Sequence, residues 1–156
     1  MPLSPPAAPT LDLDTAARLR ASIGRLSRRL RPTAAGAAAG LTPTRISVLF
    51  TIARRGPIRL SDLAEEEGLN PTMLSRVIAG FADAGLVTRV CDPQDRRAAL
   101  VEATAAGRKL CERMRGERTD VLEVALAALG EDDRRAVEQA LPVLEQLAHG
   151  LKGRRG

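Results

Sequence analysis

A two-faced segment at residues 69–85 constrains the fold more than any other part of the chain. Asn70 followed by Pro71 is a typical helix start, because asparagine can cap the first turn and proline tolerates the first helical position. Gly85 is a typical helix stop, so a helix is predicted from Pro71 to about Ala84. At helical spacing, one face is apolar: Leu74, Val77, Ile78 and Phe81. The opposite face is short and polar: Thr72, Ser75, Arg76 and Ala79.

The polar stripe of this helix suggests a use beyond packing. A helix that only packs against a core does not need a second face of mostly small side chains. Small side chains let a helix backbone approach the major groove of duplex DNA, and hydroxyls and arginine can reach base edges and phosphates. The segment is therefore interpreted as a recognition helix, and a plain solvent-exposed face is the alternative.

Two β-prone runs follow this helix, at residues 86–91 and 98–103. Between them lies a polar, turn-rich, basic stretch from Asp92 to Arg97. Extended runs on both sides of such a stretch predict a β-hairpin. An ordinary solvated turn is the alternative interpretation of the tip.

Helices are predicted on both sides of this region. An amphipathic helix is expected over 11–31, followed by a loop over 33–40. Thr42 and Pro43 begin a second helix that stops at Arg55. A short extended link over 58–60 then leads to a third helix, which Ser61 is expected to cap and which ends at Gly68.

The C-terminal third is predicted to be helical as well. Thr104 caps a long helix to about Leu129, and a last helix follows with an apolar stripe: Val137, Leu141, Leu144, Ala148 and Leu151. Pro142 lies inside this last helix and is expected to kink it or split it in two. The predicted fold class is mainly α with one small β-hairpin.

The order of these elements resembles the multiple-antibiotic-resistance regulator (MarR) family of winged helix-turn-helix proteins. The matching motifs are Leu69–Arg76 (LNPTMLSR), Ala84–Val87 (AGLV) and, most specifically, Asp92–Ala98 (DPQDRRA) at the hairpin tip. The resemblance covers roughly residues 11–150. Pro142 and the near-absence of aromatic residues depart from the family pattern, and both concern the helical part outside the DNA-reading half.

The resemblance implies a homodimer on a pseudo-palindromic double-stranded operator, with a recognition helix in the major groove and the hairpin, or wing, in the minor groove. It implies that Arg97 enters the minor groove, that Asp95 braces it and that Arg96 lies nearer the backbone. The implied DNA-binding residues are Ser61, Asn70, Pro71, Thr72, Ser75, Arg76, Asp95, Arg96 and Arg97.

The resemblance also implies a division of the chain. Residues 42–103 would form the winged helix-turn-helix, and 11–41 with 104–151 the dimerisation region. From their composition, residues 1–10, which are rich in proline, are expected to be a disordered tail, and 152–156 a basic C-terminal tail. A small apolar or aromatic effector is implied between the dimer helices and the winged domain, with Phe50 as the ring that could meet it. The implied regulator is a repressor.

The net charge by itself is weak support for a polyanion partner, and the argument depends on where the charged residues lie. The net charge is +5, but between Arg54 and Arg97 seven arginines balance seven acidic residues. Two phenylalanines and no other aromatic residue argue against single-strand binding, which stacks bases on rings. A winged-helix module that binds protein is a second interpretation, and salt dependence would separate the two.

Cys91, Cys111 and His149 are the remaining candidates for chemistry. Their spacing matches no metal site or nucleophile–base pair, and no glycine-rich phosphate loop is seen, so neither an enzyme nor a cofactor is expected. An oxidant sensor that uses Cys91 or Cys111 is an alternative regulator of the same fold. The N-terminus lacks a signal-peptide pattern and no apolar run could cross a bilayer, so a cytoplasmic protein without a membrane partner is expected.

Overall fold

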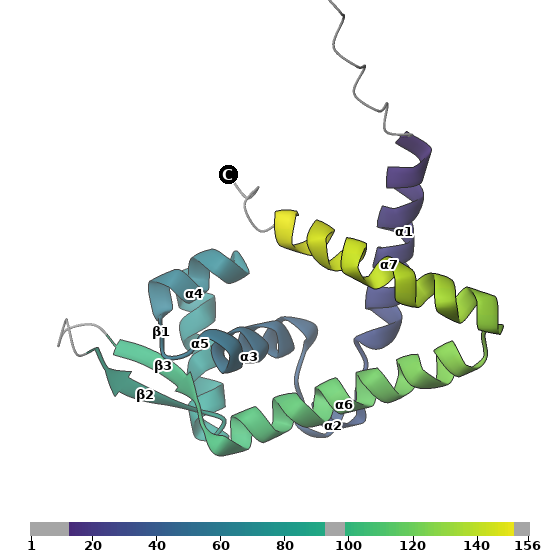
Figure 1. Ribbon diagram of the computed structural model, residues 1–156. Coiled ribbons are helices and arrows are strands. Elements are labelled where there is room, and N and C mark those ends of the chain that lie inside the picture. Colours follow the sequence, from purple (N-terminus) through teal and green to yellow (C-terminus); the bar gives the residue numbers. More distant parts are fainter. Residues whose placement is uncertain (1–12, 93–98, 152–156) are drawn as a thin grey trace, which may run out of the picture. The chain divides into compact units, whose positions relative to one another are not determined.

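Helices dominate the structure, a computed structural model that describes residues 13–92 and 99–151 (Figure 1). The helices are α1 (Leu13–Leu30), α2 (Ala34–Ala38), α3 (Pro43–Arg55), α4 (Leu60–Glu67), α5 (Pro71–Asp83), α6 (Ala105–Ala127) and α7 (Glu131–Gly150). The strands are β1 (Ile58–Arg59), β2 (Val87–Cys91) and β3 (Ala99–Ala103). These elements form two compact units that divide between Arg115 and Gly116, within α6. The predicted fold class, mainly α with a small sheet, is confirmed.

The first unit contains one antiparallel sheet in the order β1-β3-β2. β2 and β3 form the predicted hairpin, with Val87 opposite Ala103 and Cys91 opposite Ala99. The extended link expected at 58–60 is in fact a third strand, because Ile58 pairs with Val101 across the sheet. Two residues carry too little pattern to distinguish a strand from a link, and only the partner strand decides the matter.

The loop expected over 33–40 contains a short helix, so that prediction is wrong. Thr33 caps α2, and its hydroxyl accepts a hydrogen bond from the Gly36 amide at 3.1 Å. Gly36 is buried, and a Cβ added there would press on Ile46 and Met114. The small residues Ala35 and Gly36 are therefore buried in close packing, and Gly36 lies against α3 and α6.

The prediction that Ser61 caps α4 is also wrong. The helix starts at Leu60, so the cap position falls on Arg59, two residues before Ser61, and no side chain makes a cap bond. The Ser61 hydroxyl instead donates to Asp62 Oδ1 at 3.2 Å. Because β1 runs directly into α4, strand pairing determines where this helix begins, and the serine falls in the first turn.

The core of the first unit lies where α3, α4 and α5 gather beside the sheet (Figure 1). Its largest fully buried side chains are aliphatic apart from one ring: Phe81, Leu49, Ile52, Leu63, Leu74, Ile78 and Met114. All four residues predicted to form the inner face of the recognition helix belong to this core. The core holds α5 by one face and leaves its other face in solvent.

A tight junction joins the end of α5 to the start of α6. Gly85 ends α5 with a positive φ of 68°, a conformation that suits glycine. The Thr104 hydroxyl caps α6 as predicted, accepting from the Gly107 amide at 3.1 Å and donating to the Gly85 carbonyl at 2.6 Å. A Cβ at Gly107 would overlap the carbonyl oxygen of Leu86, so only glycine fits here.

The second unit consists of the end of α6 and α7. The structure has α7 as one helix from Glu131 to Gly150, so the predicted split at Pro142 does not occur. A proline removes a single backbone donor, and long helical stretches on both sides keep their own hydrogen bonds. None of the residues of α7 is buried within the chain, although its apolar stripe is present.

Candidate nucleic-acid interface

The outer face of α5 is the best-formed candidate surface. The Asn70 side chain caps the helix as predicted, with its oxygen accepting from the Met73 amide at 2.8 Å. Pro71 follows at the first helical position. The predicted polar stripe is exposed throughout: Thr72, Ser75, Arg76 and Ala79. The two-faced character inferred from the sequence is therefore confirmed, and the helix presents hydroxyls and one arginine to solvent.

A hollow of about 630 Å³ adjoins the N-terminal half of α5. Two arginines, two polar and two apolar residues line this hollow: Arg45, Arg76, Asn70, Thr72, Met73 and Val77. Arg45 comes from α3, and sequence reasoning missed it. Its position in the first turn of a predicted helix carried no signal, because the neighbouring helix that it faces is distant in the chain.

Two of the seven acidic residues that balance the charge in the sequence, Glu66 and Glu67, are held between α3 and α4. Glu66 pairs with Arg54 at 2.7 Å and with Arg55 at 2.6 Å. The Thr51 hydroxyl donates to Glu67 at 2.6 Å. These two carboxylates therefore have local partners, and the two arginines at the end of α3 share the single charge of Glu66. Across residues 13–92 and 99–151, by contrast, neither Arg45 nor Arg76 forms an ion pair with a carboxylate.

An ion pair anchors the base of the hairpin tip. Arg59 in β1 donates to Asp92 Oδ2 through Nε at 3.0 Å and through Nη2 at 2.5 Å. The Asp92 side chain is only 7% exposed, and the residue directly follows β2. Sequence reasoning noted Asp92 within the tip motif but missed Arg59, because the two are 33 residues apart. The predicted minor-groove residues Asp95, Arg96 and Arg97 lie outside the described residues.

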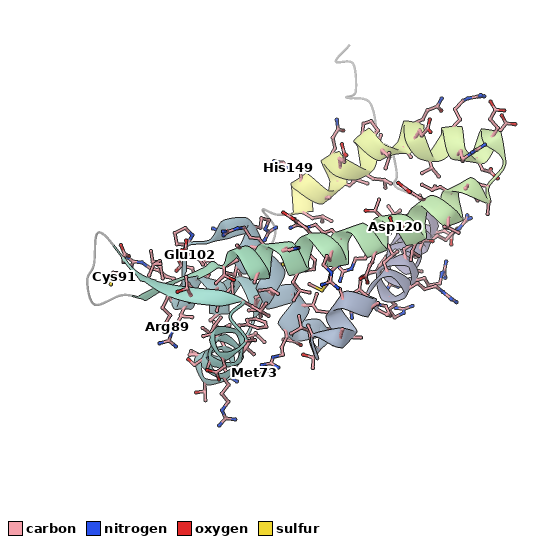
Figure 2. The ribbon with its side chains drawn as sticks, turned by 90° about the horizontal axis from the view of Figure 1, so that it is seen from below. Met73, Arg89, Cys91, Glu102, Asp120 and His149 are labelled. Carbon is pink, nitrogen blue, oxygen red and sulfur yellow. The ribbon has the colours of Figure 1, made fainter. Side chains whose placement is uncertain are left out.

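The cysteines and the histidine lie in different environments. Cys91 is exposed on β2, whereas Cys111 is buried in α6 at 1% exposure, and His149 is exposed on α7. Figure 2 shows Cys91 near the outer end of the sheet and Arg89 pointing away from the sheet on the side of α5. The described part of the chain holds no group of three or more His, Cys, Asp or Glu residues that could bind a metal ion. An oxidant-sensing role for Cys91 or Cys111 stays a prediction.

Known proteins resemble the chain in both sequence and structure. The MarR family model matches residues 41–99. An HTH-type transcriptional regulator of Mycobacterium tuberculosis (strain CDC 1551 / Oshkosh) is 33% identical over 136 residues, which cover 85% of this chain and 94% of the relative. The chain belongs to the MarR family.

Solved structures agree with this assignment at the level of the fold. The transcriptional regulator Tm0710 of Thermotoga maritima matches with a TM-score of 0.77 at 22% identity, covering 91% of this chain and 99% of that one. A variant of Staphylococcus aureus MepR bound to an oligodeoxyribonucleotide matches with a TM-score of 0.63 at 16% identity, covering 85% and 97%. The resemblance inferred from the three motifs is thus confirmed, and this MarR-family chain carries the winged helix-turn-helix of transcription regulators.

No helix in the described residues of this MarR-family chain is both long and apolar enough to span a membrane.

Proposed function

We propose that this MarR-family protein represses transcription by binding a pseudo-palindromic duplex operator as a homodimer. Each protomer would place α5 in a major groove and the wing in the adjacent minor groove, with two recognition helices about one helical turn apart. The observation that carries this proposal is the outer face of α5, where Thr72, Ser75 and Arg76 are exposed. These are the residue types that contact base edges and phosphates.

The surrounding residues support particular roles in this complex. Asn70 and Pro71 set the start of α5, and the first turn of α4 brings Ser61 to its surface. From their place in the tip motif, Arg97 would enter the minor groove, Asp95 would brace it and Arg96 would lie near the sugar–phosphate backbone. The Arg59–Asp92 ion pair would steady the strand that leads into this tip.

Exposed apolar side chains support the dimer. On α7, Leu141 is 48% exposed and Leu147 is 49%, and Leu151, the residue that follows the helix, is 64% exposed. On α1, Ile23 and Leu26 are each more than half exposed. A monomer rarely leaves stripes of this kind in water, whereas a two-fold interface would cover them. A small apolar or aromatic effector would weaken DNA binding if it favoured a dimer arrangement that misplaces the two α5 helices.

A titration of DNA binding against salt tests the proposal. Fluorescence anisotropy would be measured with a duplex from the region upstream of the gene, for the parent and for Arg97→Ala. We expect tight, salt-sensitive binding by the parent and a loss of about 1–3 kcal/mol in the variant. A Gln139→Glu variant, altered on the exposed surface of α7, serves as the control and should bind as the parent does.

Two results would contradict the proposal in different ways. Binding of the parent that is weak and equal on every duplex would favour the alternative, a winged-helix module that recognises protein. Tight binding that Arg97→Ala leaves unchanged would remove the role given to the wing while leaving α5 as the reader of DNA.

A further inference from the structure

Arg45 reaches across from α3 to the surface of the recognition helix. Its guanidinium carbon lies 5.6 Å from the centre of the Phe81 ring on α5. A Cβ built at Gly80 would overlap Nη2 of the same guanidinium. The half-buried side chain of Arg45 therefore crosses α5 where that helix has no side chain.

The position of the Arg45 guanidinium explains why residue 80 is a glycine. Glycine inside a helix is less favourable than alanine, because it adds backbone freedom to the unfolded chain. Apart from the Arg45 guanidinium, a Cβ at position 80 would meet none of the described atoms within 4 Å. The glycine thus makes room for one arginine rather than for general packing.

Arg45 also lines the hollow beside α5, together with Arg76 and Thr72. Neither arginine has a carboxylate partner in the part of the chain that the structure describes. The other arginine side chains of α3, Arg54 and Arg55, are both paired with Glu66. Two cations from two helices around one hollow, neither of them paired with a carboxylate among the described residues, favour an anion.

We infer that Arg45 and Arg76 together bind a backbone phosphate of duplex DNA, so that the DNA contact extends from the recognition helix to α3. This inference rests on the proposed function. The hollow adjoins the polar face of α5, and a helix lying in a major groove has phosphates along both of its sides. Arginine suits this role, because its planar fork can donate two hydrogen bonds to one phosphate.

The salt dependence of binding tests the inference directly. Each phosphate contact adds about 0.9 to the slope of log affinity against log salt concentration. Because Arg76 stays on the same phosphate, Arg45→Gln should lower the slope by up to about 0.9 per protomer, or up to about 1.8 in a symmetric dimer. Because a phosphate carries no sequence information, affinity should fall by the same factor, on the order of tenfold per contact, on the upstream duplex and on a random duplex.

Two matched variants control for loss of charge and of packing. Arg18→Gln removes one exposed positive charge from α1 and should leave the slope unchanged. Arg45→Lys keeps the charge without the fork, so it should keep the slope while weakening binding. Circular dichroism melting of each variant separates a folding defect from a binding defect.

Gly80→Ala probes the same contact without removing Arg45. The new methyl group must displace the guanidinium, whereas the helix itself should melt no lower, since alanine is the better helix former. We expect weaker DNA binding in this variant, and no further loss when it is combined with Arg45→Gln. Losses that add in full would mean that Gly80 acts independently of Arg45.

An unchanged salt slope for folded Arg45→Gln would overturn the inference, because the arginine would then only pack on Phe81. A smaller affinity on one duplex alone would also overturn it, since that result indicates a base contact. If the parent itself binds no duplex in a salt-dependent manner, the proposed function fails first, and the two failures are thereby distinguished.

Discussion

At the residue scale, the ion pair between Arg59 and Asp92 is expected to contribute to stability. Asp92 is buried, and Arg59 supplies two hydrogen bonds to one of its carboxylate oxygens. A buried charge is tolerated when it is paired and hydrogen-bonded, and becomes costly when a partner is removed. The pair joins β1 to the residue that directly follows β2, so it couples the sheet to the start of the wing tip.

Arg59→Gln should therefore destabilise the protein. We expect a loss of about 1–3 kcal/mol in the free energy of unfolding, because Asp92 would remain buried with a weaker partner. Urea denaturation followed by circular dichroism measures this loss. Arg89→Gln, at an exposed position of β2, is the control and should change stability by less than about 0.5 kcal/mol. Equal effects of the two variants would contradict a structural role for the pair.

At the scale of elements, the cap of α5 is open to a simple test. Asn70→Ala removes the acceptor for the Met73 amide and should lower stability by about 1 kcal/mol. Asn70→Asp keeps an acceptor and adds a negative charge that the helix start favours, so it should retain the stability. Chemical denaturation of both variants checks this expectation, and a parent-like Asn70→Ala would show that the cap adds little.

The contact between α6 and the end of α5 gives a second prediction for an element. Gly107→Ala should lower stability by about 1–3 kcal/mol, because the new methyl group overlaps the Leu86 carbonyl and the backbone must move. The gain in helix propensity, about 1 kcal/mol, is too small to compensate.

Gly116→Ala is the matched control in the same helix. A Cβ there meets nothing within 4 Å among the described residues, so this variant should be as stable as the parent or more stable. Thermal melting of the pair separates packing from propensity. The close contact would be refuted if both alanines stabilised the protein.

At the scale of the whole molecule, the exposed apolar stripes on α1 and α7 would form the interface of the proposed dimer. Leu144→Glu places a charge in the α7 stripe, where Leu144 is 38% exposed in the single chain. In the proposed dimer this charge would be buried without a partner, so the dimer should dissociate at micromolar concentration. Sedimentation velocity measures the change, with Gln139→Glu as a control of equal charge. A monomeric parent would contradict the proposed dimer.

The sequence alone determined the elements that begin with local chemistry. Thr42, Asn70 and Thr104 each accept a hydrogen bond from an amide three residues further on, and proline follows two of them. Such caps depend on neighbours within one turn of helix, so they can be recognised without tertiary structure. The two faces of α5 follow from helical periodicity for the same reason, and three motifs were specific enough to indicate the family.

The tertiary structure alone decided what depends on partners distant in the chain. β1 is a strand because β3 lies beside it, and this pairing moved the start of α4 away from Ser61. Arg59 meets Asp92, and Arg45 meets Phe81 and the space left by Gly80, only after the helices and sheet have packed. No periodicity or capping pattern encodes such contacts, because each is made between elements whose relative placement is settled by burial of the shared core.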